Sequence, residues 1–177
     1  MPGITLYEAS IPLFLKGMET LGSILDKAAA HAKEKGLDAD ADYPGARLVE
    51  DMLPLSFQIQ IASNTAKKTV ARLTGEDTVG PWEDNEKTMA ELKARVDKTI
   101  DLLKSVKPDS VDGKEDAIVE LQRGKDPTLH LPAKAYLNAY AIPNFFFHVQ
   151  TAYAILRMKG VPLGKRDYLA AFFKGYV

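Results

Sequence analysis

Apolar residues recur at spacings of three and four near the start of the sequence, which is the period of one helix face. The series is Ile11, Phe14, Leu15, Met18, Leu21, Leu25 and Ala28. Thr5 and Glu8 stand ahead of it in capping-box spacing and Gly36 follows it, so one long helix is predicted between them. Pro12 should bend this helix. An amphipathic helix must bury its apolar face, so the chain is expected to fold by packing helices together.

Two later segments carry the same helical period. They contain Leu55, Ile59, Ala62, Ala66, Val70 and Leu73, and then Met89, Leu92, Val96, Ile100 and Leu103. Asp51 stands in position to be the N-cap of the second helix, and Thr88 and Glu91 form a capping box for the third. The connector between them holds the single tryptophan, Trp82, which we expect to pack over the end of the bundle.

The helical period disappears after Lys107. Two short stretches, 117–121 and 128–131, flank a turn around Gly124 and predict a β-hairpin. A fourth helix follows, interrupted at Pro143, with the apolar positions Phe146, Val149, Tyr153, Leu156 and Met158. The run 168–173 should dock one further short helix.

These segments predict one domain over residues 1–177, an all-α, four-helix up-and-down bundle with a short β-hairpin before the last long helix. Links of about ten residues allow the first three helices to be antiparallel neighbours. The longer insertion before the fourth helix leaves room for a crossover.

Charge and cysteine content exclude several classes of function. Lys and Arg number 23 against 24 Asp and Glu, so the net charge is −1. This charge provides no positive electrostatic field that would attract nucleic acid or an anionic membrane. The absence of cysteine excludes thiol nucleophiles, disulfides and Cys-based metal sites. No apolar stretch is long enough to span a membrane and the N-terminus lacks a basic signal region, so we expect a cytoplasmic protein without membrane contact.

One helix face in the apolar fourth segment is polar. Asn144, His148 and Thr151 follow one another at spacings of four and three, and Asp51 and Gln58 form a comparable face on the second helix. We expect these faces to meet across the bundle. The candidate binding residues are therefore Asp51, Gln58, Asn144 and His148. They form either a satisfied hydrogen-bond network or a small-molecule pocket.

A metal site would have to draw on three histidines. We interpret His31 as a surface residue and His130 as a structural residue of the hairpin, which leaves His148 as the only candidate ligand. No second histidine follows it at helical spacing. A weak site formed with Glu50 and Asp51 would allow a divalent metal, but no metal ligand is assigned. Gly-rich phosphate loops and nucleophile-elbow motifs are also absent.

The order of several short motifs resembles a bacterial family known as a domain of unknown function. They are Leu6-Tyr7-Glu8-Ala9-Ser10-Ile11-Pro12, Ala46-Arg47-Leu48, Asp51-Met52, Ile142-Pro143-Asn144-Phe145, Phe147-His148, Ala152-Tyr153, Leu156-Arg157, Gly160-Val161, Leu163-Gly164-Lys165 and Asp167-Tyr168. This family is similar to the DinB/YfiT-like metalloenzymes. The resemblance implies a four-helix bundle, commonly dimeric, whose relatives hold a metal with one histidine from the second helix and two from the fourth. Some of them transfer thiols. Only His148 matches a position of that ligand set.

Three functions follow as expectations. The first is a small-molecule-binding or non-catalytic bundle protein with a degenerate metal site. The second is a metal-dependent transferase or hydrolase, similar to the thiol transferases. The third is an interaction protein whose function lies in its dimer surface. A homodimer formed through an apolar bundle face is expected in each case.

Overall fold

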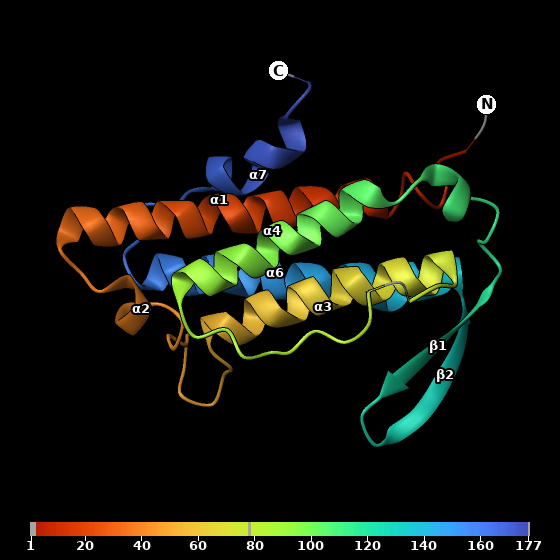
Figure 1. Ribbon diagram of the computed structural model, residues 1–177, viewed down its shortest axis with the longest axis horizontal. Helices are drawn as coiled ribbons and strands as arrows, with labels where there is room; N and C mark the ends of the chain where they lie inside the picture. The colour runs from red at the N-terminus through yellow and green to blue at the C-terminus, as the bar shows by residue number, and fades with distance from the viewer. Residues whose placement is uncertain (1–2, 78, 177) are drawn as a thin grey trace.

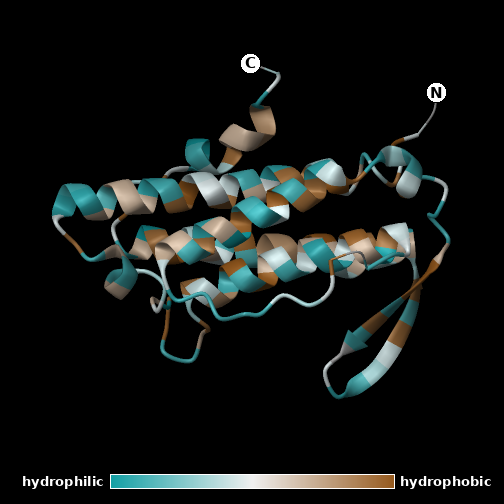
Figure 2. Ribbon diagram, in the orientation of Figure 1, coloured by the Kyte–Doolittle hydropathy of each residue, from teal (hydrophilic) through white to brown (hydrophobic). Residues whose placement is uncertain are grey.

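Four long helices lie side by side in the computed structural model, which describes residues 3–77 and 79–176 (Figure 1). They are α1 (Ile11–Lys35), α3 (Leu55–Thr74), α4 (Met89–Ser105) and α6 (Ile142–Met158). Each of them carries both hydrophobic and hydrophilic residues (Figure 2), and their buried apolar side chains form one cluster. The predicted four-helix bundle with a hairpin before the last long helix is confirmed.

The helix directions differ from a simple up-and-down order at one connection. Residues 79–88 run back along α3, so that Gly80 accepts from Lys67, Asp84 from Asn64, and Glu86 from Gln60. As a result α4 starts beside the start of α3 and runs parallel to it (Figure 1). The crossover therefore lies between the second and third bundle helices. The expected up-and-down order is therefore wrong at this connection, and the longer insertion before the fourth helix, which left room for a crossover, is not where it occurs.

The start of α1 also differs from the prediction. Thr5 and Glu8 make the expected reciprocal contacts, with N···O distances of 3.0 and 3.2 Å, but these contacts close the turn over residues 6–10. Since α1 begins only at Ile11, Pro12 lies in the first turn, where its missing N–H costs no helical hydrogen bond. The expected kink is therefore absent. Gly36 ends the helix with a left-handed φ of 66°.

The cap of α3 is the second local correction. Pro54 is the residue that precedes α3, and Asp51 lies in an exposed turn three residues earlier. Asp51 is therefore not the N-cap. The turn in which it lies is closed by backbone hydrogen bonds, one of which runs from Met52 N to Val49 O. The capping box of Thr88 and Glu91 at the start of α4 is confirmed.

The hairpin consists of β1 (Ile118–Arg123) and β2 (Asp126–Pro132), which pair antiparallel and project from one end of the bundle (Figure 1). After it the chain stays helical through α5 (Ala133–Tyr136) and the π-helical η2 (Leu137–Ala141) into α6. The wider π turn precedes Pro143, whose ring would clash with the carbonyl of residue 139 in a regular α-helix. The predicted interruption is therefore a local widening and leaves the helix continuous.

Three short helices complete the chain. They are α2 (Ala39–Asp42), the 3-10 helix η1 (Pro108–Ser110) and α7 (Lys165–Phe173). As expected for the apolar run 168–173, α7 docks on the bundle: Thr20 of α1 donates to the Tyr168 carbonyl at 3.1 Å, and Tyr168 packs edge-to-face on Tyr153 of α6. Within residues 3–77 and 79–176, no helix has the length and apolar character needed to cross a membrane.

Candidate functional site

Polar side chains join α3 to the helical segment 133–158 at three levels. Gln58 Oε1 lies 2.8 Å from His148 Nδ1, Asn144 donates to Thr65 Oγ1 at 2.8 Å, and Thr69 Oγ1 lies 3.1 Å from the Tyr136 hydroxyl. The α3 residues ascend in number as their partners descend, so the two elements run antiparallel. We call these pairs the α3–α6 polar contacts. The expectation that polar faces of the second and fourth bundle helices meet is confirmed for the pair Gln58 and His148.

The contact between Gln58 and His148 fixes the tautomer of the imidazole. Gln58 Nε2 donates to the Leu53 carbonyl at 2.9 Å, and a carbonyl can only accept. The other end of the amide, Oε1, must therefore face His148 and accept from Nδ1–H. Burial lowers the pKa of His148 to about 4, so the ring is neutral at physiological pH and its Nε2 carries a lone pair.

Aromatic rings surround this histidine. The ring of Phe57 lies 6.1 Å from it and that of Phe147 lies 5.2 Å from it, both edge-to-face. His148 itself is only 8% exposed, whereas Phe147 is 59% exposed. His148 Nε2 has no hydrogen-bond partner in the described part of the chain, and this atom is not completely enclosed by the protein. The unpaired nitrogen therefore lies beside an exposed aromatic ring.

The other predicted site residues are placed differently. Asp51 is exposed and makes no hydrogen bond or ion pair with any described residue, so it does not join His148. Asn144 contacts Thr65 and not Gln58. Thr151 donates to the Phe147 carbonyl of its own helix at 2.7 Å. Of the four candidates, the structure therefore brings only Gln58 and His148 into contact.

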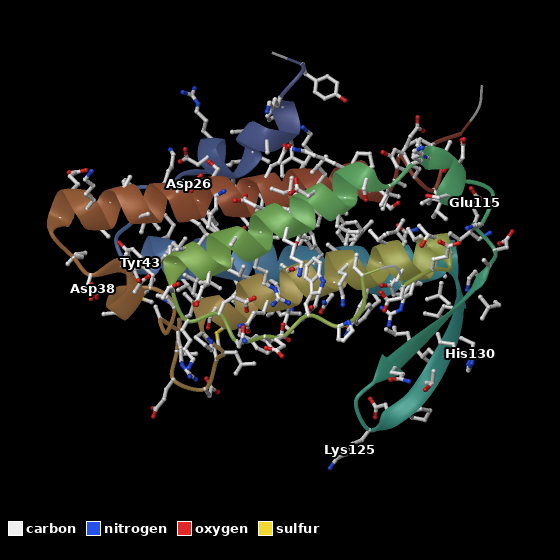
Figure 3. The ribbon with its side chains drawn as sticks, viewed as in Figure 1. Asp26, Asp38, Tyr43, Glu115, Lys125 and His130 are labelled. Atoms are coloured by element: carbon white, nitrogen blue, oxygen red, sulfur yellow. The ribbon has the colours of Figure 1, made fainter. Side chains whose placement is uncertain are left out.

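The donor set does not fit a three-histidine metal centre. Across the described ranges 3–77 and 79–176, no three His, Cys, Asp or Glu side chains are grouped so that they could hold a metal. Figure 3 shows His130 on the hairpin, away from the bundle, and its Nε2 lies 3.5 Å from Glu120 across the strands. This carboxylate partner was not expected, because it comes from strand pairing and not from neighbouring sequence. On α3 an amide, Gln58, faces His148 where a metal centre would need a second ligand.

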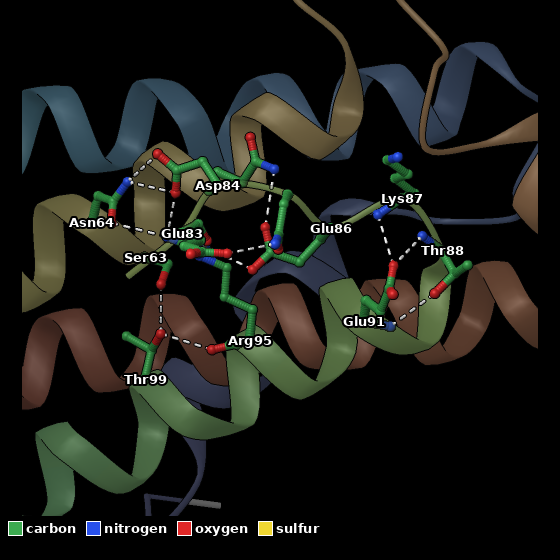
Figure 4. A network of polar contacts seen from close by, with 12 residues as sticks. Ser63, Asn64, Glu83, Asp84, Glu86, Lys87, Thr88, Glu91, Arg95 and Thr99 are labelled. Atoms are coloured by element: carbon green, nitrogen blue, oxygen red, sulfur yellow. Dashed lines mark hydrogen bonds and ion pairs between the residues drawn. The ribbon is translucent and has the colours of Figure 1, made fainter. Parts of the chain in front are cut away.

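A larger polar network around Arg95 was missed by sequence reasoning (Figure 4). The guanidinium pairs with Asp84 at 2.6 Å and Glu86 at 2.7 Å, and it also donates to the Glu83 carbonyl and to Asn64. Its side chain is only 2% exposed. The network attaches the returning connector to α3 and α4. One signal in the sequence could have indicated that Arg95 is buried and needs partners. It stands next to Val96 and three residues after Leu92, on the apolar side of its helix.

The single tryptophan belongs to the same region. Lys98 lies 4.2 Å from the centre of the Trp82 ring, and Lys67 and Arg95 lie 5.4 and 5.8 Å from it. These cations come from the middle of α3 and α4. Trp82 therefore packs along the side of the bundle, and the expectation that it covers the bundle end was wrong.

Comparison with known proteins agrees with this architecture. The family model described as domain of unknown function DUF1993 matches residues 6–169. A crystal structure of a DinB family member protein from Shewanella denitrificans is 37% identical, with a TM-score of 0.83 over 93% of this chain and 91% of that one. No curated protein matches the sequence. The chain therefore belongs to the DUF1993 family, and its helical bundle is of the DinB type.

Proposed function

We propose that the protein binds a small organic molecule at the α3–α6 face, through His148 Nε2 and the neighbouring aromatic rings, without a three-histidine metal centre. The observation that carries this proposal is the fixed amide of Gln58. Because Leu53 holds its Nε2, Oε1 accepts from His148 Nδ1 and leaves His148 Nε2 as a permanent acceptor. The ligand class is a molecule with one hydrogen-bond donor attached to an aromatic or apolar group.

Binding is favoured over proton transfer by the basicity of the histidine. A general base works best when its pKa lies near the working pH. The pKa of His148 is lowered to about 4 by burial, so the neutral ring is a weak proton acceptor near pH 7. A neutral ring still accepts a hydrogen bond from a ligand.

The metal-dependent transferase or hydrolase is supported less well. A catalytic metal needs about three protein ligands and an open position. His148 presents one suitable nitrogen, and its neighbours across the interface are the amide of Gln58 and the ring of Phe57. We derive no reaction step through a metal for this reason.

The test is a titration with phenol, which carries a donor and a ring, against anisole, which has the ring without the donor. Protein labelled with ¹⁵N at histidine reports the His148 Nε2 resonance directly. We expect phenol to shift this resonance and to bind about fivefold more tightly than anisole, the ratio expected for one neutral hydrogen bond.

Two phenylalanines of similar exposure provide the matched control. Phe147→Ala should weaken phenol binding, because Phe147 lies beside His148. Phe173→Ala on α7 should not, although Phe173 is 53% exposed. If phenol and anisole bind equally, or if His148→Ala lowers stability without changing phenol binding, the polar contacts only fix helix register and the proposal fails.

A further inference from the structure

A hollow lies where the hairpin meets α3. It has a volume of about 420 Å³ and is lined by Lys68, Ala71, Arg72, Gln122 and Gly124. The hollow is linked to the α3–α6 polar contacts through Tyr136, whose hydroxyl accepts a hydrogen bond from the lining residue Arg72. Two of the five lining residues are cationic and none is acidic.

The position of Arg72 is fixed by both sides of the hollow. Its Nε donates to the Glu120 carbonyl of β1 at 3.2 Å, and its Nη1 donates to the Tyr136 hydroxyl at 3.0 Å. Its guanidinium carbon also lies 5.0 Å from the centre of the Tyr136 ring. A guanidinium has five N–H donors, so three remain without a partner among the described residues. This arginine is held in place and still has donors available.

Lys68 adds a second free cation on the same helix face. It precedes Arg72 by four residues, and side chains at this spacing are neighbours on a helix. It is exposed and forms no ion pair or hydrogen bond within the described ranges. The Glu120 carboxylate lies 3.5 Å from His130 Nε2 across the strands, and only its backbone carbonyl contacts Arg72. Neither Lys68 nor Arg72 therefore forms an ion pair with a residue that the structure describes.

We propose that this hollow binds the phosphate group of a small phosphate monoester. Two unpaired cations match the charge of the dianion, which is close to −2 at pH 7. The planar guanidinium suits a bidentate contact with phosphate oxygens, and the Gln122 amide supplies a further donor from β1. The hollow exceeds the volume of a phosphate group, so the organic part of the ligand lies along the hairpin.

The experiment is calorimetry at low ionic strength with phenyl phosphate and benzoate, which share a ring and differ in the anion. We expect phenyl phosphate to bind about tenfold more tightly than benzoate at pH 7.5, because charge-assisted contacts to a dianion are stronger. Lowering the pH to 5.5 protonates phenyl phosphate once and should reduce this ratio. Inorganic phosphate alone should bind more weakly than phenyl phosphate.

Lys68→Ala is the informative variant, because Lys68 is exposed and forms no hydrogen bond or ion pair among the described residues. It should weaken phenyl phosphate binding about tenfold. Lys33→Ala removes the same charge from the exposed C-terminal turn of α1, at the opposite end of the bundle from the hairpin, and should have no effect (Figure 1). Arg72→Lys keeps the charge but loses the bidentate contact, and it should also weaken binding.

Several outcomes would overturn the proposal. They are equal binding of benzoate and phenyl phosphate, equal effects of Lys68→Ala and Lys33→Ala, or no binding heat at low salt. His148→Ala should leave phenyl phosphate binding unchanged. The result is therefore separable from the outcome of the phenol experiment at the α3–α6 face.

Discussion

Gly17 of α1 lies directly against the ring of Phe145 in α6. A Cβ atom at position 17 would stand 2.2 Å from Phe145 Cε1. The ring cannot move away easily, since Phe145 is fully buried and packs edge-to-face on both Phe14 and Phe146. The two helices can approach this closely only because residue 17 has no side chain.

Gly17→Ala should lower the free energy of unfolding by about 1–3 kcal/mol, the usual cost of overpacking. Gly22→Ala is the matched control, because Gly22 is also buried in α1 but its Cβ would meet Val96 at an ordinary 3.5 Å. That variant should gain about 0.5–1 kcal/mol from helix propensity. Urea unfolding measures both, and equal effects would contradict the packing argument.

Arg95→Ala tests the attachment of the connector. The change removes the partner of Asp84 and Glu86 and leaves a cavity under residues 83–86. We expect a loss of about 2–3 kcal/mol, less than for a fully buried pair, because the Asp84 side chain is 42% exposed. Lys98→Ala, which removes only an exposed cation above Trp82, should cost about 0.5 kcal/mol. Similar losses for both variants would show that the network does not stabilise the connector.

Thr88→Ala tests the capping box of α4. Thr88 Oγ1 accepts from Glu91 N at 3.2 Å, and Glu91 Oε2 accepts from Thr88 N at 2.9 Å. Loss of the hydroxyl should cost about 1 kcal/mol in chemical denaturation. Thr88→Ser keeps the acceptor and should restore most of the stability. If serine and alanine behave alike, the hydroxyl does not cap the helix.

Local structure could be predicted because it depends on neighbouring residues. The apolar spacing of α1 and the capping box at Thr88 need only three or four residues to be recognised. The direction of α4 depends on pairs that are distant in sequence. Fourteen extended residues span about 45 Å and the twenty residues of α3 span about 30 Å. The connector length therefore permits both orders, and contacts such as Asn64 with Asp84 decide between them.

The candidate site was predicted in part for the same reason. Residues 144 and 148 share a helix face by spacing alone, so a polar face could be recognised. The partner of each depends on the register of α3 against α6, which sequence does not show. The prediction for Asp51 was wrong because this residue lies in a turn three residues before Pro54, the residue that precedes α3. The homodimer and the cytoplasmic location stay predictions.

Metal addition separates the binding proposal from a metal-dependent reaction. Protein stripped with a chelator should melt at the same temperature with and without zinc, nickel or manganese, because among the residues that the structure describes no second histidine or carboxylate is grouped with His148. A metal at 100 times its dissociation constant would add about 2.7 kcal/mol. Stoichiometric metal that is lost in His148→Ala would contradict this prediction and revive the metalloenzyme alternative.

The buried neutral state of His148 predicts a stability loss in acid. In the unfolded chain its pKa returns to the ordinary 6.5, whereas burial holds it at about 4 in the folded protein. Between these values the unfolded state binds more protons, so the free energy of unfolding falls as pH is lowered from 6.5 towards 4. The full difference corresponds to about 3 kcal/mol. His148→Gln should remove this part of the pH dependence in urea titrations, and His130→Gln, at an exposed hairpin position, should retain it. If the wild-type and His148→Gln curves stay parallel, the imidazole is not held neutral by the fold.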